Sequence, residues 1–240
     1  MESIAKLFEE KQYYHAFQPI CRLPEKTRIG YEALLRSSAN VNPEALFRQA
    51  QEKGELTILD IHSLHNALLA FFSSPDRPAS ELLFVNIFPS TIVEAAFPTF
   101  MEQLAREFAE RLSQIVLEIN ESVMEGEIWN EPLFLQRIQF LRELGFMIAL
   151  DDVGDGTTTF RKILEVAPDY IKMDRFFSKN LSESRKKQKV VRLFVEFCQD
   201  DSLLILEGIE GEEDFACAAS LGVAIGQGYL FGKPGGLTGE

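Results

Sequence analysis

The chain has 240 residues, of which 46% are hydrophobic and 25% are charged, so its composition is that of a folded globular protein and excludes a disordered or fibrous one. Its 24 Lys and Arg against 37 Asp and Glu give a formal net charge of −13, and so acidic a surface argues against DNA or RNA binding. No stretch approaches the roughly 20 apolar residues of a membrane helix. Three irregularly spaced cysteines suit a reducing compartment, which favours a cytoplasmic protein.

Short β-rich apolar runs alternate with stretches of helical periodicity, a pattern typical of a parallel sheet covered by helices. We expect strands over 15–22 and 27–36, joined by a short turn that indicates an antiparallel pair, and then over 81–89, 114–120, 145–153, 168–174, 202–209 and 223–232. Helices are expected over 43–72, 91–111, 130–144, 157–166, 183–199 and 211–221. This order predicts a single domain over residues 1–240, either a closed (β/α)₈ barrel or an open doubly wound sheet.

Acidic, amide and lysine side chains recur where these predicted strands end. In a barrel such positions point to the mouth at the C-terminal ends of the strands, where active sites of this architecture lie. One such acid would most simply cap a helix or make a turn. Several converging carboxylates need compensation, because two charges ~4 Å apart repel by about 4 kcal/mol at an effective dielectric of 20. The residues are Glu32, Asn86, Glu118, Asp151, Asp152, Lys172, Asp174 and Glu207.

Carboxylates together with an amide carbonyl select Mg²⁺ or Mn²⁺ over zinc. With enough carboxylates for two ions, the set predicts metal-assisted phosphodiester hydrolysis, in which two metals ~3.5–4 Å apart activate a water and stabilise the displaced oxygen. Lys172 would orient the water or neutralise developing charge. The same residues also suit proton abstraction next to a carboxylate, with the lysine as base. The spacing alone does not separate these two reactions.

At these residues the chain resembles the EAL-domain family, bacterial phosphodiesterases that convert cyclic di-GMP to linear pGpG. The name-giving motif stands as Glu32-Ala33-Leu34 within YEALLR. The segments AFQPI, VNI, LEINE, DDVGDG, YIKMD, EGIE and QGYLFGKP also stand in the family's order, from about Phe17 to Pro234. The resemblance implies an α/β fold, a modified TIM (β/α)₈ barrel with its first strand antiparallel to the rest. It also implies dependence on Mg²⁺ or Mn²⁺, with two ions per site.

The resemblance further implies a role for each matching position. The implied metal ligands are Glu32, Asn86, Glu118 and Asp151, with Asp152 serving the second ion. The implied catalytic group comprises Lys172 at the attacking water, Glu207 as general base or water-orienting group, Gln227, and Asp174 as a support of the metal site. The implied substrate contacts are Arg36 to a phosphate and Gln18 and Leu34 on the guanine side, while Glu121 anchors the loop after Asp152.

Two positions depart from the family pattern. The loop that the family usually writes DDFGTGYSS is DDVGDGTTT over 151–159, and Ala224 replaces an aspartate found in many members. Asp155, in the altered loop, would either face the metals and raise the Mg²⁺ requirement or cap the following helix. The altered loop keeps a second hypothesis open, namely a receptor that binds cyclic di-GMP, turns it over poorly and signals to a partner protein. A Mg²⁺-dependent lyase or isomerase is disfavoured, because the whole motif series would then be coincidence.

The expected partners follow from the same resemblance. They are cyclic di-GMP, a second copy of the chain bound through helices near the altered loop, and a regulatory protein or sensor domain acting in trans. No DNA or RNA and no membrane segment is expected. Since the family pattern begins near Phe17, the chain either works alone with such partners or is a piece of a longer protein.

Overall fold

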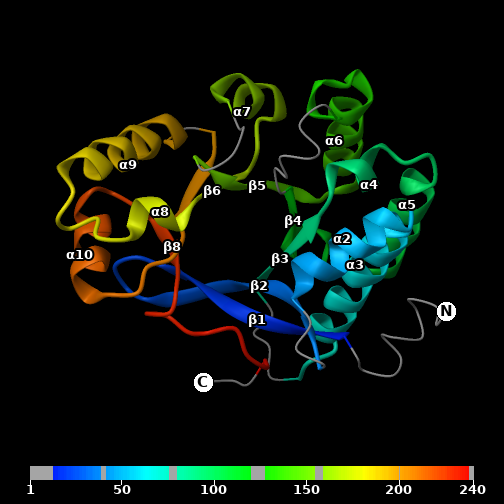
Figure 1. Ribbon diagram of the computed structural model, residues 1–240, viewed down its shortest axis with the longest axis horizontal. Helices are drawn as coiled ribbons and strands as arrows, with labels where there is room; N and C mark the ends of the chain where they lie inside the picture. The colour runs from blue at the N-terminus through cyan, green and yellow to red at the C-terminus, as the bar shows by residue number, and fades with distance from the viewer. Residues whose placement is uncertain are drawn as a thin grey trace.

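The computed structural model describes residues 13–38, 42–75, 80–119, 128–154, 159–199 and 201–237. The strands in this part close into a barrel in chain order, and helices surround it (Figure 1). β1 pairs antiparallel with both β2 and β8, and the remaining neighbours pair in parallel. The modified TIM barrel is therefore confirmed, and the open doubly wound sheet is wrong. The strands are β1 (Tyr13–Arg22), β2 (Thr27–Ser37), β3 (Leu82–Ile87), β4 (Ile115–Ile119), β5 (Met147–Val153), β6 (Tyr170–Met173), β7 (Leu203–Leu206) and β8 (Ile225–Gln227).

The helices follow the predicted order but are shorter and more divided. The helix expected over 43–72 is split, because Gly54 adopts a φ of 68°, in the left-handed region that ends helices. The helix expected over 91–111 is also two helices, and the second has a proline in its first turn. A short helix directly after β6, α8, was not predicted. The helices are α2 (Pro43–Glu52), α3 (Leu56–Phe72), α4 (Pro89–Val93), α5 (Phe97–Glu107), α6 (Pro132–Leu144), α7 (Phe160–Val166), α8 (Arg175–Ser178), α9 (Arg185–Cys198) and α10 (Glu212–Ser220).

A layer of apolar side chains fills the interior of the barrel. Since successive side chains of a strand point to opposite faces, the residue two positions further along also faces inward. The layer directly above the apolar one therefore lies at the mouth of the barrel. The apolar layer consists of Ile20, Phe84, Val116, Ala149, Tyr170, Ile205 and Ile225.

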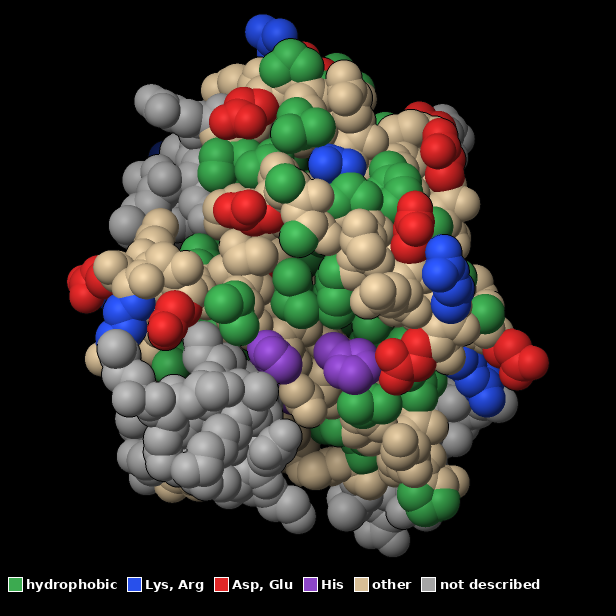
Figure 2. Space-filling model, turned by 90° about the vertical axis from the view of Figure 1, so that its right-hand side faces the viewer, with side chains coloured by type: hydrophobic (Ala, Val, Ile, Leu, Met, Phe, Trp, Pro, Cys, Tyr) green, Lys and Arg blue, Asp and Glu red, His purple; other side chains and the backbone are tan. Residues whose placement is uncertain are grey.

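The outer surface of the described part carries charges of both signs. Figure 2 shows acidic and basic side chains interspersed on the face over α2, α3 and α5, without a continuous basic patch in what is coloured there. Among the described residues, no helix has the length and apolar character needed to cross a membrane.

Candidate active site

The candidate site continues the interior of the barrel by one layer. Asn86 stands two residues beyond Phe84, and Glu118 stands two residues beyond Val116. Strand pairing then places Asn86 directly opposite Glu118. Four more residues stand two positions beyond a residue of the apolar layer: Asp151, Lys172, Glu207 and Gln227. Gln18, on the antiparallel β1, lies opposite Glu32. Sequence-distant polar residues thus meet because the strands are in register.

Lys172 is the centre of this layer, with its side chain 1% exposed. Its Nζ lies 2.8 Å from Glu118 Oε1 and 2.8 Å from Glu207 Oε1. It lies 3.0 Å from Asp151 Oδ1 and 3.3 Å from Glu32 Oε2. Four carboxylates therefore share one ammonium, so the cluster keeps an excess of negative charge in a buried place, which favours the binding of further cations.

Burial and this excess charge shift the pKa values of the cluster. Burial, followed by the Glu32 charge, raises the pKa of Glu118 well above its usual value. Burial likewise raises the pKa of Glu207 to about 8. Burial alone would raise the pKa of Glu32, but Lys172 and the surrounding hydrogen bonds outweigh it and lower that pKa. Burial opposes the charged form of Lys172, yet its carboxylate neighbours hold its pKa well above the usual value, so the lysine stays charged.

Two amide side chains orient the carboxylates, and a third amide, that of Gln18, accepts from one of them. Asn86 Nδ2 donates to Glu32 Oε1 and to Glu118 Oε2, each at 3.3 Å. Gln227 Nε2 donates to Glu32 Oε2 at 2.7 Å and to Gln18 Oε1 at 3.3 Å. Because Asn86 turns its nitrogen toward the carboxylates, ligation of an ion by its Oδ1 would require a half-turn of the amide group.

The remaining predicted residues lie at different places. Asp152, half-buried and with a φ of 53°, has a carboxylate oxygen within 4.8 Å of oxygens from Asp151 and Glu207. Asp174 instead caps α8, where its Oδ1 accepts from Phe176 N at 2.7 Å, and it belongs to neither of the carboxylate groups found among the described residues. Glu121 and Asp155 lie outside the described residues.

The donor set fits divalent cations. Oxygens of Glu32, Glu118 and Asp151 also lie within 4.8 Å of one another, forming a second group that shares Asp151 with the first. Glu118 Oε1 and Asp151 Oδ1 are buried, and the Lys172 ammonium is their one close polar neighbour among the described residues. Buried carboxylate oxygens with so few donors are suited to a hard ion such as Mg²⁺ or Mn²⁺. Two ions could therefore be held side by side by these groups.

A cavity of about 480 Å³ opens beside the mouth, between the ends of β2 and β3 and the helices α2 and α3. Leu34, Arg36, Asn86 and Asp152 line it, which places predicted substrate contacts and predicted metal ligands around one space. Phe47 and Phe88 also line it, with ring centroids 5.0 Å apart. Nothing in the sequence marks these two phenylalanines as site residues, because phenylalanine is common in the hydrophobic core of a protein.

His15 and Ser63 also line this cavity. The His15 Nε2 and Ser63 Oγ atoms are 3.1 Å apart. Burial, with the nearby Arg36 charge, lowers the pKa of His15 to about 4, so the ring is neutral at pH 7. A neutral ring bonded to a hydroxyl can donate or accept toward a polar ligand.

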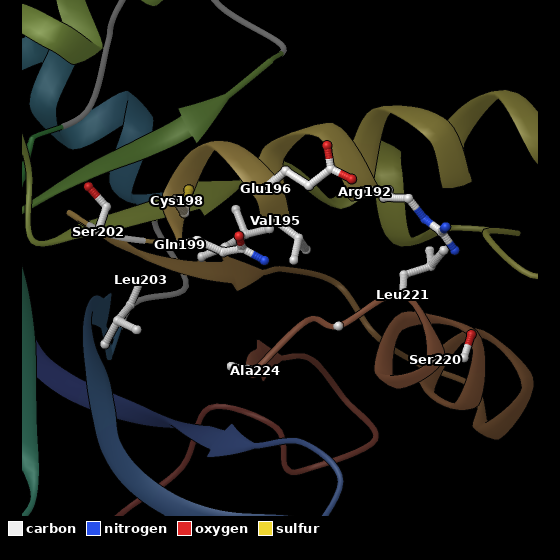
Figure 3. Close-up of a pocket in the computed structure, with 12 residues that line it drawn as sticks. Arg192, Val195, Glu196, Cys198, Gln199, Ser202, Leu203, Ser220, Leu221 and Ala224 are labelled. Atoms are coloured by element: carbon white, nitrogen blue, oxygen red, sulfur yellow. The ribbon is translucent and has the colours of Figure 1, made fainter.

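A second cavity, of about 530 Å³, lies far from the carboxylates (Figure 3). Side chains of α9 line one wall, including Arg192 and Glu196, and the end of α10 lines another. Ala224, one of the two departures from the family pattern, is exposed at its border. Ala224 lies three residues before Gln227 and outside the mouth. Alanine in place of the family's aspartate therefore does not change the residues of the carboxylate layer.

The comparison with known families agrees with this geometry. The sequence profile described as "EAL domain" matches residues 1–234. The chain belongs to the EAL-domain family. The predicted resemblance is thus confirmed over nearly the whole sequence, and the carboxylate layer described above belongs to an EAL domain.

Relatives of this EAL domain share about a quarter of its residues. "Cyclic di-GMP phosphodiesterase PdeF" of Escherichia coli (strain K12) is 25% identical over 239 residues, covering 98% of this chain and 31% of that protein. The structure described as "EAL Enzyme Bd1971 - cAMP and cyclic-di-GMP bound form" has a TM-score of 0.82 and 25% identity, covering 98% of this chain and 65% of that one. The "Klebsiella pneumoniae BlrP1 pH 6 manganese/cy-diGMP complex" has a TM-score of 0.81 and 25% identity, covering 93% and 56%. This chain thus spans only part of the length of each of these proteins.

Proposed function

We propose that the chain is one EAL-type domain that hydrolyses one phosphodiester of cyclic di-GMP to give linear pGpG. The observation that carries the proposal is the cluster of four carboxylates around the buried ammonium of Lys172 at the mouth of an EAL barrel. The names of the relatives supply the substrate: PdeF is named a cyclic di-GMP phosphodiesterase, and the Bd1971 and BlrP1 structures contain cyclic di-GMP.

The proposed cofactors are two Mg²⁺ or Mn²⁺ ions. Glu32, Glu118 and Asp151, with the Asn86 amide oxygen, would hold one ion, and Asp152 would serve the second beside Asp151 and Glu207. When bound, such a pair lowers the pKa of a water molecule and stabilises the oxygen displaced in an in-line attack. The manganese in the BlrP1 complex supports this choice of metal.

Within this proposal, Lys172 and Glu207 act on the attacking water. The Lys172 ammonium is held at the centre of the cluster and stays charged, so it can donate to that water and stabilise developing negative charge. Glu207 Oε2 is the proposed acceptor or orienting atom, because Glu207 stands beside the lysine with its pKa raised to about 8. Gln227 holds the Glu32 carboxylate, and Asp174 supports the site through α8.

The proposed substrate position extends from the mouth into the 480 Å³ cavity. The Arg36 guanidinium would bind a phosphate, since a charge-assisted contact of this kind is strong and directional. Leu34, Phe47 and Phe88 offer apolar walls for a flat base, and Gln18 borders the other side of the mouth through its contact with Gln227. The apolar walls suit a guanine base, and the guanidinium suits its phosphate.

A receptor that binds cyclic di-GMP without hydrolysing it is the alternative. The altered loop favours it, because Asp152 adopts an unusual backbone conformation directly before the replaced residues. Chromatography of cyclic di-GMP incubated with the pure protein separates the two functions. The enzyme forms pGpG with Mg²⁺ or Mn²⁺, forms little with Ca²⁺ and forms none with excess chelator. Tight binding with no pGpG at saturating Mn²⁺ would overturn the enzyme and leave the receptor.

A second copy of the chain is the proposed protein partner. Phe160 and Leu164 of α7 are 49% and 68% exposed, and Leu193 and Phe197 of α9 are 52% and 37% exposed beside them. Light scattering should report a dimer for the natural sequence and a monomer for Leu164→Glu. Leu69→Glu, a similar change on α3, is the matched control and should remain dimeric. A regulatory protein or sensor domain in trans and a cytoplasmic location belong to the same proposal, and cell fractionation tests the location.

A further inference from the structure

The short helix α8 packs against the backbone that carries the carboxylate group of Asp151, Asp152 and Glu207. The ring of Phe177 lies on Gly154, where a Cβ would stand 2.5 Å from Phe177 Cε2 and 2.9 Å from Cζ. Gly154 has a φ of 104°, a conformation that other residues rarely adopt. The ring therefore occupies the space that any larger residue at position 154 would need. Phe177 is itself half-buried and packs against the main hydrophobic core.

The backbone held in this way is strained. Asp152 is a non-glycine residue with a φ of 53°, and the pairing of β5 with β6 shifts register between Leu150 and Val153. Such a left-handed conformation is unfavourable for a residue with a Cβ and persists only where the surroundings hold it. The two residues directly after Asp152 in the chain are held by contacts with α8 and its N-cap. Asp174 N–H donates to Val153 O at 3.3 Å, and the Phe177 ring lies on Gly154.

The same helix also borders the turn that carries Glu207. Gly208 has a φ of 69°, and a Cβ on it would overlap the side chain of Arg175 in α8. α8 therefore lies between the turn after β5 and the turn after β7. Asp152 lies in the irregular end of β5, directly before the first of these turns, and Glu207 begins the second; their carboxylates form one group with Asp151.

From these contacts we infer that Phe177 is a positioning residue for Asp152: its ring fixes the Asp151–Gly154 turn and thereby the spacing of the Asp151, Asp152 and Glu207 carboxylates. The inference rests on the proposed metal site, and Phe177 acts through Gly154 rather than by touching an ion or substrate. Removing the ring frees the strained turn to relax, so the second ion loses a preformed ligand.

The first test measures Mn²⁺ binding to the substrate-free protein by titration calorimetry. Phe177→Ala should weaken binding of the second ion about tenfold, in the range seen when residues that orient metal ligands are removed. Phe177→Leu should restore most of the affinity. Phe176→Ala is the matched control, because the neighbouring side chain is 58% exposed, and it should bind Mn²⁺ as the natural sequence does. A folded Phe177→Ala protein with unchanged Mn²⁺ affinity would overturn the inference.

The second test remains decisive if Phe177→Ala fails to fold. Gly154→Ala places a methyl group against the ring, so it should weaken Mn²⁺ binding in the natural background. In a Phe177→Leu background the ring is gone, and the loss of Mn²⁺ affinity caused by Gly154→Ala should be at least fivefold smaller. Equal effects in the two backgrounds contradict the contact.

Assaying pGpG formation by the natural sequence keeps the two proposals apart. Mn²⁺ binding without hydrolysis contradicts the proposed function alone, and equal affinities across the variants contradict the positioning role alone.

Discussion

The two halves of the candidate metal site are held by different kinds of structure. Glu32 and Glu118 are buried and stand where the pairing of β2 with β3 and of β3 with β4 is regular, so the hydrogen-bonded sheet itself places them. Asp152 and Glu207 are half-buried, one in an irregular end of β5 and the other directly after β7. Asp151 is shared by both groups. Regular strands make one half rigid, whereas the other half depends on turns and on the helix packed against them.

Removing the shared lysine should affect both halves and have the largest effect. Lys172→Met leaves four buried carboxylates without their ammonium, which should lower the unfolding free energy of the metal-free protein by about 3–5 kcal/mol. The kcat for cyclic di-GMP hydrolysis should fall about 10²–10³-fold even with Mn²⁺. Urea denaturation with and without chelator, together with steady-state kinetics, measures both effects. A variant as stable as the natural sequence without metal would show that the four carboxylates do not depend on this ammonium.

An isosteric change in each half compares the halves directly. Glu118→Gln removes a ligand that the strands hold rigidly and no neighbour can replace, so Mn²⁺ affinity should fall at least about 100-fold. Asp152→Asn in the half-buried, irregular half should lower the affinity about tenfold, because the turn can readjust. Calorimetric titration of both variants measures the contrast. If Asp152→Asn lost more affinity than Glu118→Gln, the rigid half would not be the one that anchors the metals.

The difference between the halves also explains what the sequence could predict. Glu118 and Lys172 were predictable because each extends an apolar strand by a fixed two-residue offset, so strand assignment and the period of two suffice. The antiparallel β1 came from the short turn before β2 and from the family pattern. The break in the helix expected over 43–72 was not predicted, because helical periodicity continues on both sides of the single Gly54.

Contacts between separate segments were not predictable in this way. The packing of Phe177 on Gly154 joins a residue of α8 to the turn after β5, and nothing in local composition indicates it. The cap that the Asp174 side chain forms on α8 was likewise not predictable from its position two residues after Lys172. The cavity lining from α2 and α3 depends on how α2 packs against β2 and α3 against β1 and β3, which side-chain packing decides.

The pH dependence of metal-free stability should distinguish Glu207 from the rest of the cluster. Its pKa of about 8 in the folded protein lies above the usual 4.5, so its contribution to stability is present below about pH 4.5 and is lost as pH rises through about 8. Between pH 5 and 8 the natural sequence should therefore lose about 3 kcal/mol more than Glu207→Gln, which cannot ionise there. His15, whose pKa of about 4 acts in the opposite sense, is common to both proteins and cancels. Parallel pH slopes in chelator would show that Glu207 is already ionised in the metal-free fold.

The smallest effect is expected outside both halves, at Arg36. Its guanidinium lines the cavity rather than the carboxylate layer, so Arg36→Ala should remove a phosphate contact and raise KM about tenfold, equivalent to about 1.4 kcal/mol. The kcat and the Mn²⁺ affinity should stay near their natural values, because uniform binding affects substrate and transition state alike. Arg48→Ala is the matched control: it removes another arginine of the same cavity, one that stands on α2 away from the mouth, and should change KM less. A loss of kcat with unchanged KM for Arg36→Ala would place this residue in the chemistry, and the division between a metal layer and a separate substrate cavity would fail.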